Sequence, residues 1–272
     1  MSSKNKKFII AFIVINLIYI VFLLGNKILT SDNGNMPVIS FDEDVITVSV
    51  KSKEKTLLEG VVASDVEDGD ISDDIFIYSI STFDENNERT ITYAVFDSED
   101  QLVTASRKLK YKDYTPPKFK ASQPLFNLSM NSNDDTSYIS ATSSVDGNIS
   151  NKVSVSRVEN DNKVIYKYNV TDSTGTTSTI EVTDEFSFNG LYSNIDIILD
   201  EYIIYVDKGT ELDTRKYIDS VETSLGEQNE LIYAIDVETN YNKDEEGIYE
   251  VKYTLNRSNG DYGISKLIVV VE

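Results

Sequence analysis

The sequence predicts an all-β protein built from three tandem copies of one small β-sandwich domain. Two sequence phrases recur along the 272 residues. DGDIS at 68–72 returns as DGNIS at 146–150, and YAVFDS at 93–98 returns as YNVTDS at 168–173 and, more weakly, as YTLNRS at 253–258. A repeat of about 80 residues is typical of tandem copies of one domain. Outside the N-terminal segment no long helical period occurs, and short strands separated by turns favour a sandwich.

The N-terminal segment 8–29 is predicted to be a membrane-spanning signal-anchor helix. An apolar run at 8–24, interrupted only by Asn16, follows a lysine-containing stub at 1–7. The positive-inside rule then places the stub in the cytoplasm and the remainder outside the cell, as a single-pass protein whose first partner is the lipid bilayer. A cleaved signal peptide is the alternative, although no small-x-small cleavage site follows the run. Residues 30–36 form a polar linker.

Three predicted domains follow the linker, at 37–113, 118–184 and 194–272. The pair Pro116-Pro117 separates the first two, because consecutive prolines cannot continue a strand ladder. A turn-forming pair, Asn189-Gly190, lies between the second and the third. The third domain loses the DGDIS motif and has residues 220–227 in its place.

Each predicted domain contains strands with alternating apolar residues, as expected when one face of a strand is buried. The penultimate strands centre on Tyr93, Tyr168 and Tyr253, which fall on the apolar phase and are predicted to lie in the core. In the opening strands the apolar phase comprises Ile46, Val48, Val50, Phe126, Leu128, Met130, Tyr202, Ile204 and Val206. The closing strand of the third domain is predicted at 266–271.

The composition limits the chemistry that the chain can perform. There are no Cys and no His residues, so disulfides, thiol nucleophiles and the commonest general base and metal ligand are missing. The formal net charge of −21 argues against nucleic acid as a partner, because phosphate binding demands positive charge. An acidic surface by itself indicates solubility and self-repulsion.

The repeated phrases resemble a known family. The residues DVEDGDISDDI at 65–75, YAVFDS at 93–98 and Pro116-Pro117 are similar to the bacterial immunoglobulin-like repeats of Gram-positive surface proteins, which also occur in pesticidal crystal proteins. VDKGTEL at 206–212 and GIYEVKY at 247–253 extend the resemblance into the third domain. The resemblance implies immunoglobulin-like sandwiches used as a stalk or binding module, with no catalytic residues to transfer. A self-made Lys–Asn or Lys–Asp cross-link occurs in some such domains, but the sequence does not single out a pair.

The acidic loop at 65–74 is the one metal candidate. Its carboxylates are Asp65, Glu67, Asp68, Asp70, Asp73 and Asp74. The spacing does not match an EF-hand, so we interpret the loop as a solvated turn with capping Asp residues and keep a weak calcium site as the alternative. We therefore assign no catalytic, cofactor-binding or metal-binding residue and expect no cofactor.

The sequence as a whole predicts a membrane-anchored, extracytoplasmic cell-surface protein that acts without catalysis, as an adhesion or interaction module. The expected partner is an extracellular protein or glycan of unknown identity, which the distal third domain would meet first. The alternative is a structural spacer or an accessory subunit of a cell-envelope assembly. A carboxylate-dependent hydrolase is the least favoured interpretation, since it requires two carboxyl groups in a cleft, one of them with a raised pKa.

Overall fold

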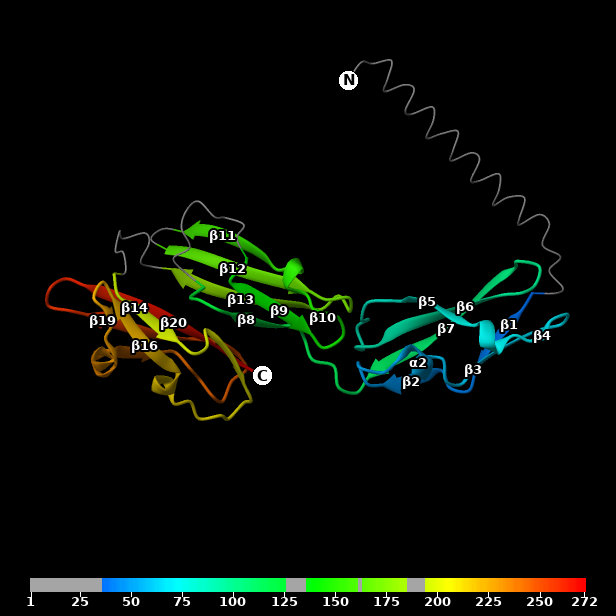
Figure 1. The fold of residues 1–272 in the computed structure, drawn as a ribbon. Coiled ribbons are helices and arrows are strands. Elements are labelled where there is room, and N and C mark those ends of the chain that lie inside the picture. The colour runs from blue at the N-terminus through cyan, green and yellow to red at the C-terminus, as the bar shows by residue number, and fades with distance from the viewer. Residues whose placement is uncertain (1–35, 126–135, 161–162, 185–193) are drawn as a thin grey trace, which may run out of the picture. The chain divides into compact units, whose positions relative to one another are not determined.

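A computed structural model of the chain describes residues 36–125, 136–160, 163–184 and 194–272 (Figure 1). The predicted stub, membrane span and linker, and the strand residues Phe126, Leu128 and Met130, lie outside these ranges. Within them, no helix is long and apolar enough to cross a membrane. The described chain is all-β, as predicted, and its helices are single short turns.

The chain divides into two compact units. The smaller unit consists of residues up to Ile46 together with Glu54–Ile80 and Thr90–Lys108, and the larger unit consists of Thr47–Lys53, Ser81–Arg89 and Leu109–Glu272. The larger unit therefore contains both of the predicted domains 118–184 and 194–272. The division into three domains stays a prediction.

The element order of the first copy sets the plan for the others. One sheet has the order β1-β3-β4 and the other the order β2-β7-β6-β5. The elements are β1 (Val38–Phe41), β2 (Val45–Val48), α2 (Glu54–Leu57), β3 (Val61–Asp65), β4 (Gly69–Asp70), η1 (Ser72–Asp74), β5 (Phe76–Ile80), β6 (Arg89–Phe96) and β7 (Leu102–Tyr111).

The third copy repeats this sheet order, and the second repeats it in the strands that the structure describes, without a counterpart of β2. Their sheets run β10-β9-β8 and β11-β12-β13, then β14-β16-β17 and β15-β20-β19-β18. The second copy has β8 (Lys118–Ala121), β9 (Ile139–Ser143), β10 (Gly147–Asn148), η2 (Ser150–Lys152), β11 (Ser154–Asn160), β12 (Lys163–Thr171) and β13 (Thr177–Asp184). The third has β14 (Asp196–Leu199), β15 (Ile203–Val206), η4 (Thr214–Tyr217), β16 (Ile218–Thr223), β17 (Gly226–Glu227), η5 (Asn229–Ala234), β18 (Asp236–Thr239), β19 (Gly247–Asn256) and β20 (Tyr262–Val271). The closing strand thus begins four residues before the predicted 266–271, because β20 pairs with the whole of β19.

The three repeated tyrosines lie in the core, which confirms the prediction from alternation. Tyr93, Tyr168 and Tyr253 have no exposed surface. Each hydroxyl group donates a hydrogen bond to a main-chain carbonyl oxygen, that of Leu57 (2.6 Å), Leu125 (2.9 Å) and Thr214 (2.7 Å) respectively. Each ring is buried as apolar surface, while its hydroxyl group satisfies a carbonyl of α2, of η4 or of the segment at Leu125. The three residues therefore fasten these segments to the core. In the larger unit one buried apolar cluster extends from Phe119 to Val269.

The DGDIS turn persists in the third copy, although its sequence does not. Gly226 has φ +93°, as Gly69 (+76°) and Gly147 (+71°) do in the other copies. Asn229 accepts the Val221 N–H through its Oδ1 atom (3.2 Å), in the place where Ser72 accepts the Ala63 N–H (3.0 Å). The backbone turn is therefore retained at 220–227 although the motif is lost, because other side chains now close it.

Candidate functional site

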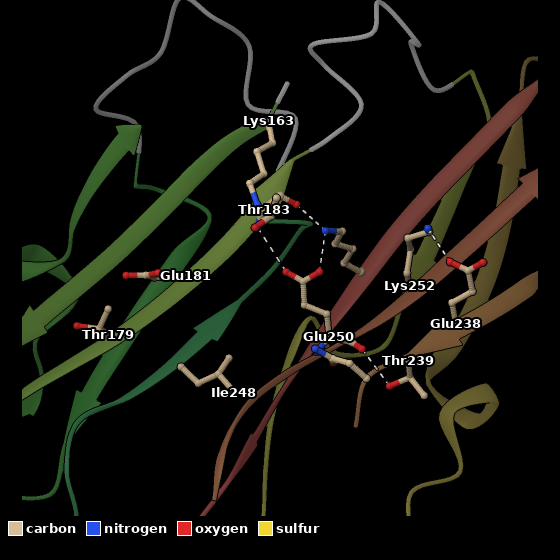
Figure 2. A pocket seen from close by; sticks show the side chains of 11 residues that line it. Lys163, Thr179, Glu181, Thr183, Glu238, Thr239, Ile248, Glu250 and Lys252 are labelled. Atoms are coloured by element: carbon tan, nitrogen blue, oxygen red, sulfur yellow. Dashed lines mark hydrogen bonds and ion pairs between the residues drawn. The ribbon is translucent and has the colours of Figure 1, made fainter. Parts of the chain in front are cut away.

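The main candidate is a groove of about 830 Å³ in the larger unit (Figure 2). It is open to solvent over the faces of β12 and β13 on one side and of β18, β19 and β20 on the other. Its lining is mainly polar: Lys163, Thr179, Glu181, Thr183, Glu238, Thr239, Asn240, Ile248, Glu250, Lys252 and Lys266.

Strand register explains how the charged side chains meet. Lys252 lies opposite Glu238 on β18 and opposite Lys266 on β20, so two lysines face each other in one cross-strand row. Like charges in that position repel. The repulsion is offset because Glu238 pairs with Lys252 (2.7 Å) and Glu250 pairs with Lys266 (2.7 Å).

Lys266 forms the floor of the groove. Its side chain is only 5% exposed, and its Nζ atom donates to the Thr183 carbonyl oxygen (2.5 Å) and to Glu250 Oε2 (2.7 Å). Glu250 Oε1 accepts the Thr183 N–H (3.4 Å), so the Lys266–Glu250 pair joins β13 to β19 and β20. Figure 2 shows the Glu250 side chain lying beside Thr183. This pair fixes the spacing between the two walls.

The wall on the β18 side is held by main-chain hydrogen bonds to polar side chains. The Glu250 N–H donates to Asn240 Oδ1 (2.8 Å), and Thr239 Oγ1 donates to the Glu250 carbonyl oxygen (3.0 Å). The Asn240 amide nitrogen and the Lys163 ammonium group have no hydrogen-bond partner among the residues that the structure describes. Both can donate to a ligand.

The charges of the groove residues that the structure describes are balanced. Three lysines and three glutamates are among these residues, in a chain with a formal net charge of −21. The hydrogen bond from Lys252 lowers the pKa of Glu238, which keeps that carboxyl group ionised. Ile248 is the sole apolar residue in the described part of the lining. The groove therefore offers hydrogen-bond donors and acceptors rather than an apolar or charged surface.

A second, smaller cavity of about 360 Å³ lies between β8, β9 and β15. The Lys118 ammonium group sits 4.7 Å from the centre of the Tyr205 ring, and the Phe119 N–H donates to the Tyr205 hydroxyl oxygen (2.7 Å). Burial raises the pKa of Tyr205 to about 12. Tyr205 thus connects β15 to β8, and we assign this cavity a structural role.

The acidic loop 65–74 uses its carboxylates to cap its own turn, as the first interpretation predicts. Asp65 Oδ1 accepts the N–H groups of Glu67 (2.8 Å) and Asp68 (3.1 Å), and these bonds lower its pKa. Asp70 accepts the Ser72 hydroxyl (2.6 Å) and N–H (3.0 Å), with the same effect on its pKa. Within the described ranges, no three Asp or Glu side chains are grouped to hold a metal ion.

The two repeated phrases touch each other, which the sequence did not reveal. Asp68 Oδ2 accepts the Ser98 N–H and Asp146 Oδ2 accepts the Ser173 N–H, both at 2.8 Å. In the third copy the aspartate position is taken by Leu225, which is 80% exposed. The available signal that the phrases form one contact was their joint change in the third copy, where DGDIS is lost and YAVFDS weakens to YTLNRS.

Comparisons with known proteins give no family assignment. No family model matches the chain, and no curated protein matches it. Among solved structures, the M60 catalytic domain with the CBM51-1 and CBM51-2 domains of Clostridium perfringens ZmpB aligns at 12% identity over 87% of this chain and 31% of that chain, with a TM-score of 0.24. CBM51-2 in complex with GlcNAc and INT domains of the same protein aligns at 19% identity over 50% of this chain and 29% of that chain, also with a TM-score of 0.24.

Cadherin domains 3–6 of protocadherin gamma B2 align at 12% identity over 86% of this chain and 73% of that chain, with a TM-score of 0.17. The chain spans about a third of the length of the ZmpB chains that it matches. TM-scores this low carry no argument, so the function is argued from the groove.

Proposed function

We propose that the chain is a non-enzymatic interaction module of the cell surface, and that its groove binds an uncharged glycan. The balanced, mainly polar lining carries this proposal. Carbohydrate hydroxyl groups both donate and accept hydrogen bonds, and the lining supplies carboxylate, amide, hydroxyl and ammonium partners at one site.

Other ligand classes fit the groove less well. A nucleic acid would meet a chain of net charge −21, whereas counterion release requires a basic surface. Among the groove residues within the described ranges, a hydrophobic peptide would find Ile248 alone as an apolar contact. An extended polar peptide is the competing occupant, because β13 and β18 are edge strands of their sheets. The glycan is favoured because the Thr183 N–H and carbonyl oxygen on the β13 edge are already bonded to Glu250 and Lys266.

Binding without hydrolysis agrees with the state of the carboxyl groups. Glu181 pairs with Lys167 (2.8 Å), Glu238 with Lys252, and Glu250 with Lys266. A glycosidase needs one carboxyl group that stays protonated near neutral pH. The hydrogen bond from Lys252 lowers the pKa of Glu238, and the other two carboxylates are held in ion pairs, so this lining favours recognition over acid catalysis.

Attachment to the membrane through residues 8–29, with the N-terminus in the cytoplasm, is part of the proposal and rests on the apolar run and its preceding lysines. Protease treatment of intact cells tests it: the chain beyond residue 30 should be digested, and protection of that part would contradict the orientation.

A stiff spacer within an envelope assembly is the second candidate function. The single buried cluster from Phe119 to Val269 favours it, because a continuous core makes the larger unit rigid. A spacer should copurify with a membrane partner that is lost when residues 8–24 are exchanged for an unrelated anchor, and it should show no glycan binding.

A glycan array followed by titration calorimetry tests the proposed function. The full-length chain should retain neutral oligosaccharides, and Lys163→Ala should weaken binding about tenfold because it removes one charge-assisted hydrogen bond. Asn256→Ala is the matched control, since Asn256 is an exposed polar residue of β19 outside the groove. Equal affinities of the two variants would refute the site.

A further inference from the structure

Three apolar side chains of the smaller unit are exposed close together on neighbouring strands. Phe76 on β5, Phe96 on β6 and Leu102 on β7 are 37%, 46% and 43% exposed. The two phenylalanine rings lie nearly parallel, at 17° and 6.1 Å between centres. In the sheet order, β6 lies between β5 and β7, as Figure 1 shows.

The sheet register places these residues on one face. Phe76 lies opposite Ala94, and Phe96 is two residues further along the same strand, so both point to the same side as Ala94. Ala94 has no exposed surface. Phe96 and Leu102 flank the hairpin turn closed by the Asp97 N–H and the Gln101 carbonyl oxygen (3.2 Å). We call Phe76, Phe96 and Leu102 the apolar patch.

The other copies of the fold show that these positions need not be apolar. The equivalent residues are Ser154, Thr171 and Thr177 in the second copy, and Asp236, Asn256 and Tyr262 in the third. In the second copy the hydroxyl groups of Thr171 and Thr177 hydrogen-bond to each other (2.7 Å). The sheet therefore forms with hydroxyl side chains at these positions, and large apolar side chains are not required there for the stability of the fold.

The surroundings of the apolar patch are acidic. Segments 61–80 and 90–102 contain no lysine or arginine. Their exposed acids are Glu67, Asp68, Asp70, Asp73, Asp74, Glu99 and Asp100. The hydrogen bond from the Ser98 N–H to Asp68 brings the 65–70 turn beside the hairpin that carries Phe96. The patch is thus an apolar centre with a negatively charged rim.

We propose that the apolar patch is a second binding site, which docks a basic segment of another protein. A complementary segment presents aliphatic or aromatic side chains to the phenylalanines and lysine or arginine side chains to the acidic rim. Charge complementarity selects this occupant. A second copy of the chain or an anionic lipid surface would bring negative charge against the same rim.

Surface binding with a designed probe tests the proposal. The probe is an immobilised amphipathic peptide of alternating leucine and lysine pairs, and the analyte is the full-length chain. We expect Phe96→Thr/Leu102→Thr, which installs the residues of the second copy, to weaken binding at least tenfold. Val158→Thr, an exposed apolar residue of β11, is the control and should leave binding unchanged. Because neither variant alters charge, non-specific attraction of the basic peptide cannot produce this difference.

Two further measurements distinguish the contribution of the acidic rim from that of the apolar patch, and binding of a basic segment from the other possible occupants. Glu99→Gln/Asp100→Asn should weaken binding severalfold and flatten its salt dependence, and Asn suits the φ of +63° at position 100. A peptide with glutamate in place of every lysine should not bind. Equal binding by the patch variant, self-association of the chain abolished by that variant, or patch-dependent binding to anionic vesicles would each overturn the proposal.

Discussion

Replacing Lys266 by methionine should break the floor of the groove. The substitution removes the ammonium group that bonds to the Thr183 carbonyl oxygen and to Glu250, in a side chain only 5% exposed. Removing one partner of a buried pair costs about 3–5 kcal/mol when the other is left without compensation. Glu250 is 28% exposed and keeps the Thr183 N–H, so water and that bond offset part of the cost. We expect a loss of about 2 kcal/mol in the unfolding free energy of the larger unit.

Native-state hydrogen exchange is the suitable assay, because it reports β19 and β20 separately from the smaller unit. Lys167→Met is the matched control. Its partner Glu181 is an exposed cross-strand acid of the same larger unit, and we expect a change below about 0.5 kcal/mol. Adding Glu250→Met to Lys266→Met should restore part of the stability, since both charges are then absent. Equal losses in Lys266→Met and Lys167→Met would refute the reasoning.

Three other changes have defined outcomes. Tyr93→Phe should lower the free energy of unfolding, measured with denaturant, by about 2 kcal/mol, because buried Arg107 loses an acceptor at 2.9 Å. Tyr253→Phe removes one hydrogen bond and should cost about 1 kcal/mol. Equal costs for the two substitutions would contradict this expectation. Gly226→Ala should lower the free energy of unfolding by about 1–2 kcal/mol. The cost comes from the backbone φ of +93° alone, because an added Cβ meets no atom within 4 Å. An unchanged melting temperature would exclude a left-handed turn at this position. Burial acts to raise the pKa of Asp146, but hydrogen bonds from Ser173 and the Lys152 ion pair outweigh it and lower the pKa. The ionised Asp146 carboxylate therefore stabilises the folded state above its unfolded pKa of 3.8, and this stabilisation is lost as the pH falls through the lower pKa of the folded state. Asp146→Asn should make the melting temperature fall less steeply as the pH is lowered.

Much of the fold follows from local rules. Alternation places Tyr93, Tyr168 and Tyr253 in the core because the period of two is a property of the single strand. The turn in the third copy could not be predicted from the DGDIS phrase, for a physical reason. A positive φ needs only Gly226, and an N–H acceptor can be Asn229 as well as a serine, so the geometry survives after the phrase has changed.

The groove could not be predicted in the same way. Glu250, Lys252 and Lys266 occupy the polar phase of their strands, which from sequence alone indicates an ordinary solvated face. Their convergence depends on the register between β18, β19 and β20 and on the docking of Lys266 against Thr183, more than eighty residues earlier in the chain. Such contacts are set by tertiary packing, which a single sequence does not encode locally.

The apolar patch lies between these two cases. Phe76 and Phe96 are visible in the sequence, and comparison with Ser154 and Thr171 in the second copy would have identified them as unusual. The sequence could not show that the two rings stack on an outward face, or that Ala94 on β6 is buried.

The most direct test of glycan binding in the groove is hydrogen exchange of the full-length chain with and without the neutral oligosaccharide retained best on the array. Binding in the groove should slow exchange in the peptides of β13, β18 and β19, leave β5 and β6 unchanged, and return the oligosaccharide uncleaved. Protection confined to other strands, or shortening of the oligosaccharide, would contradict a non-enzymatic glycan site in this groove.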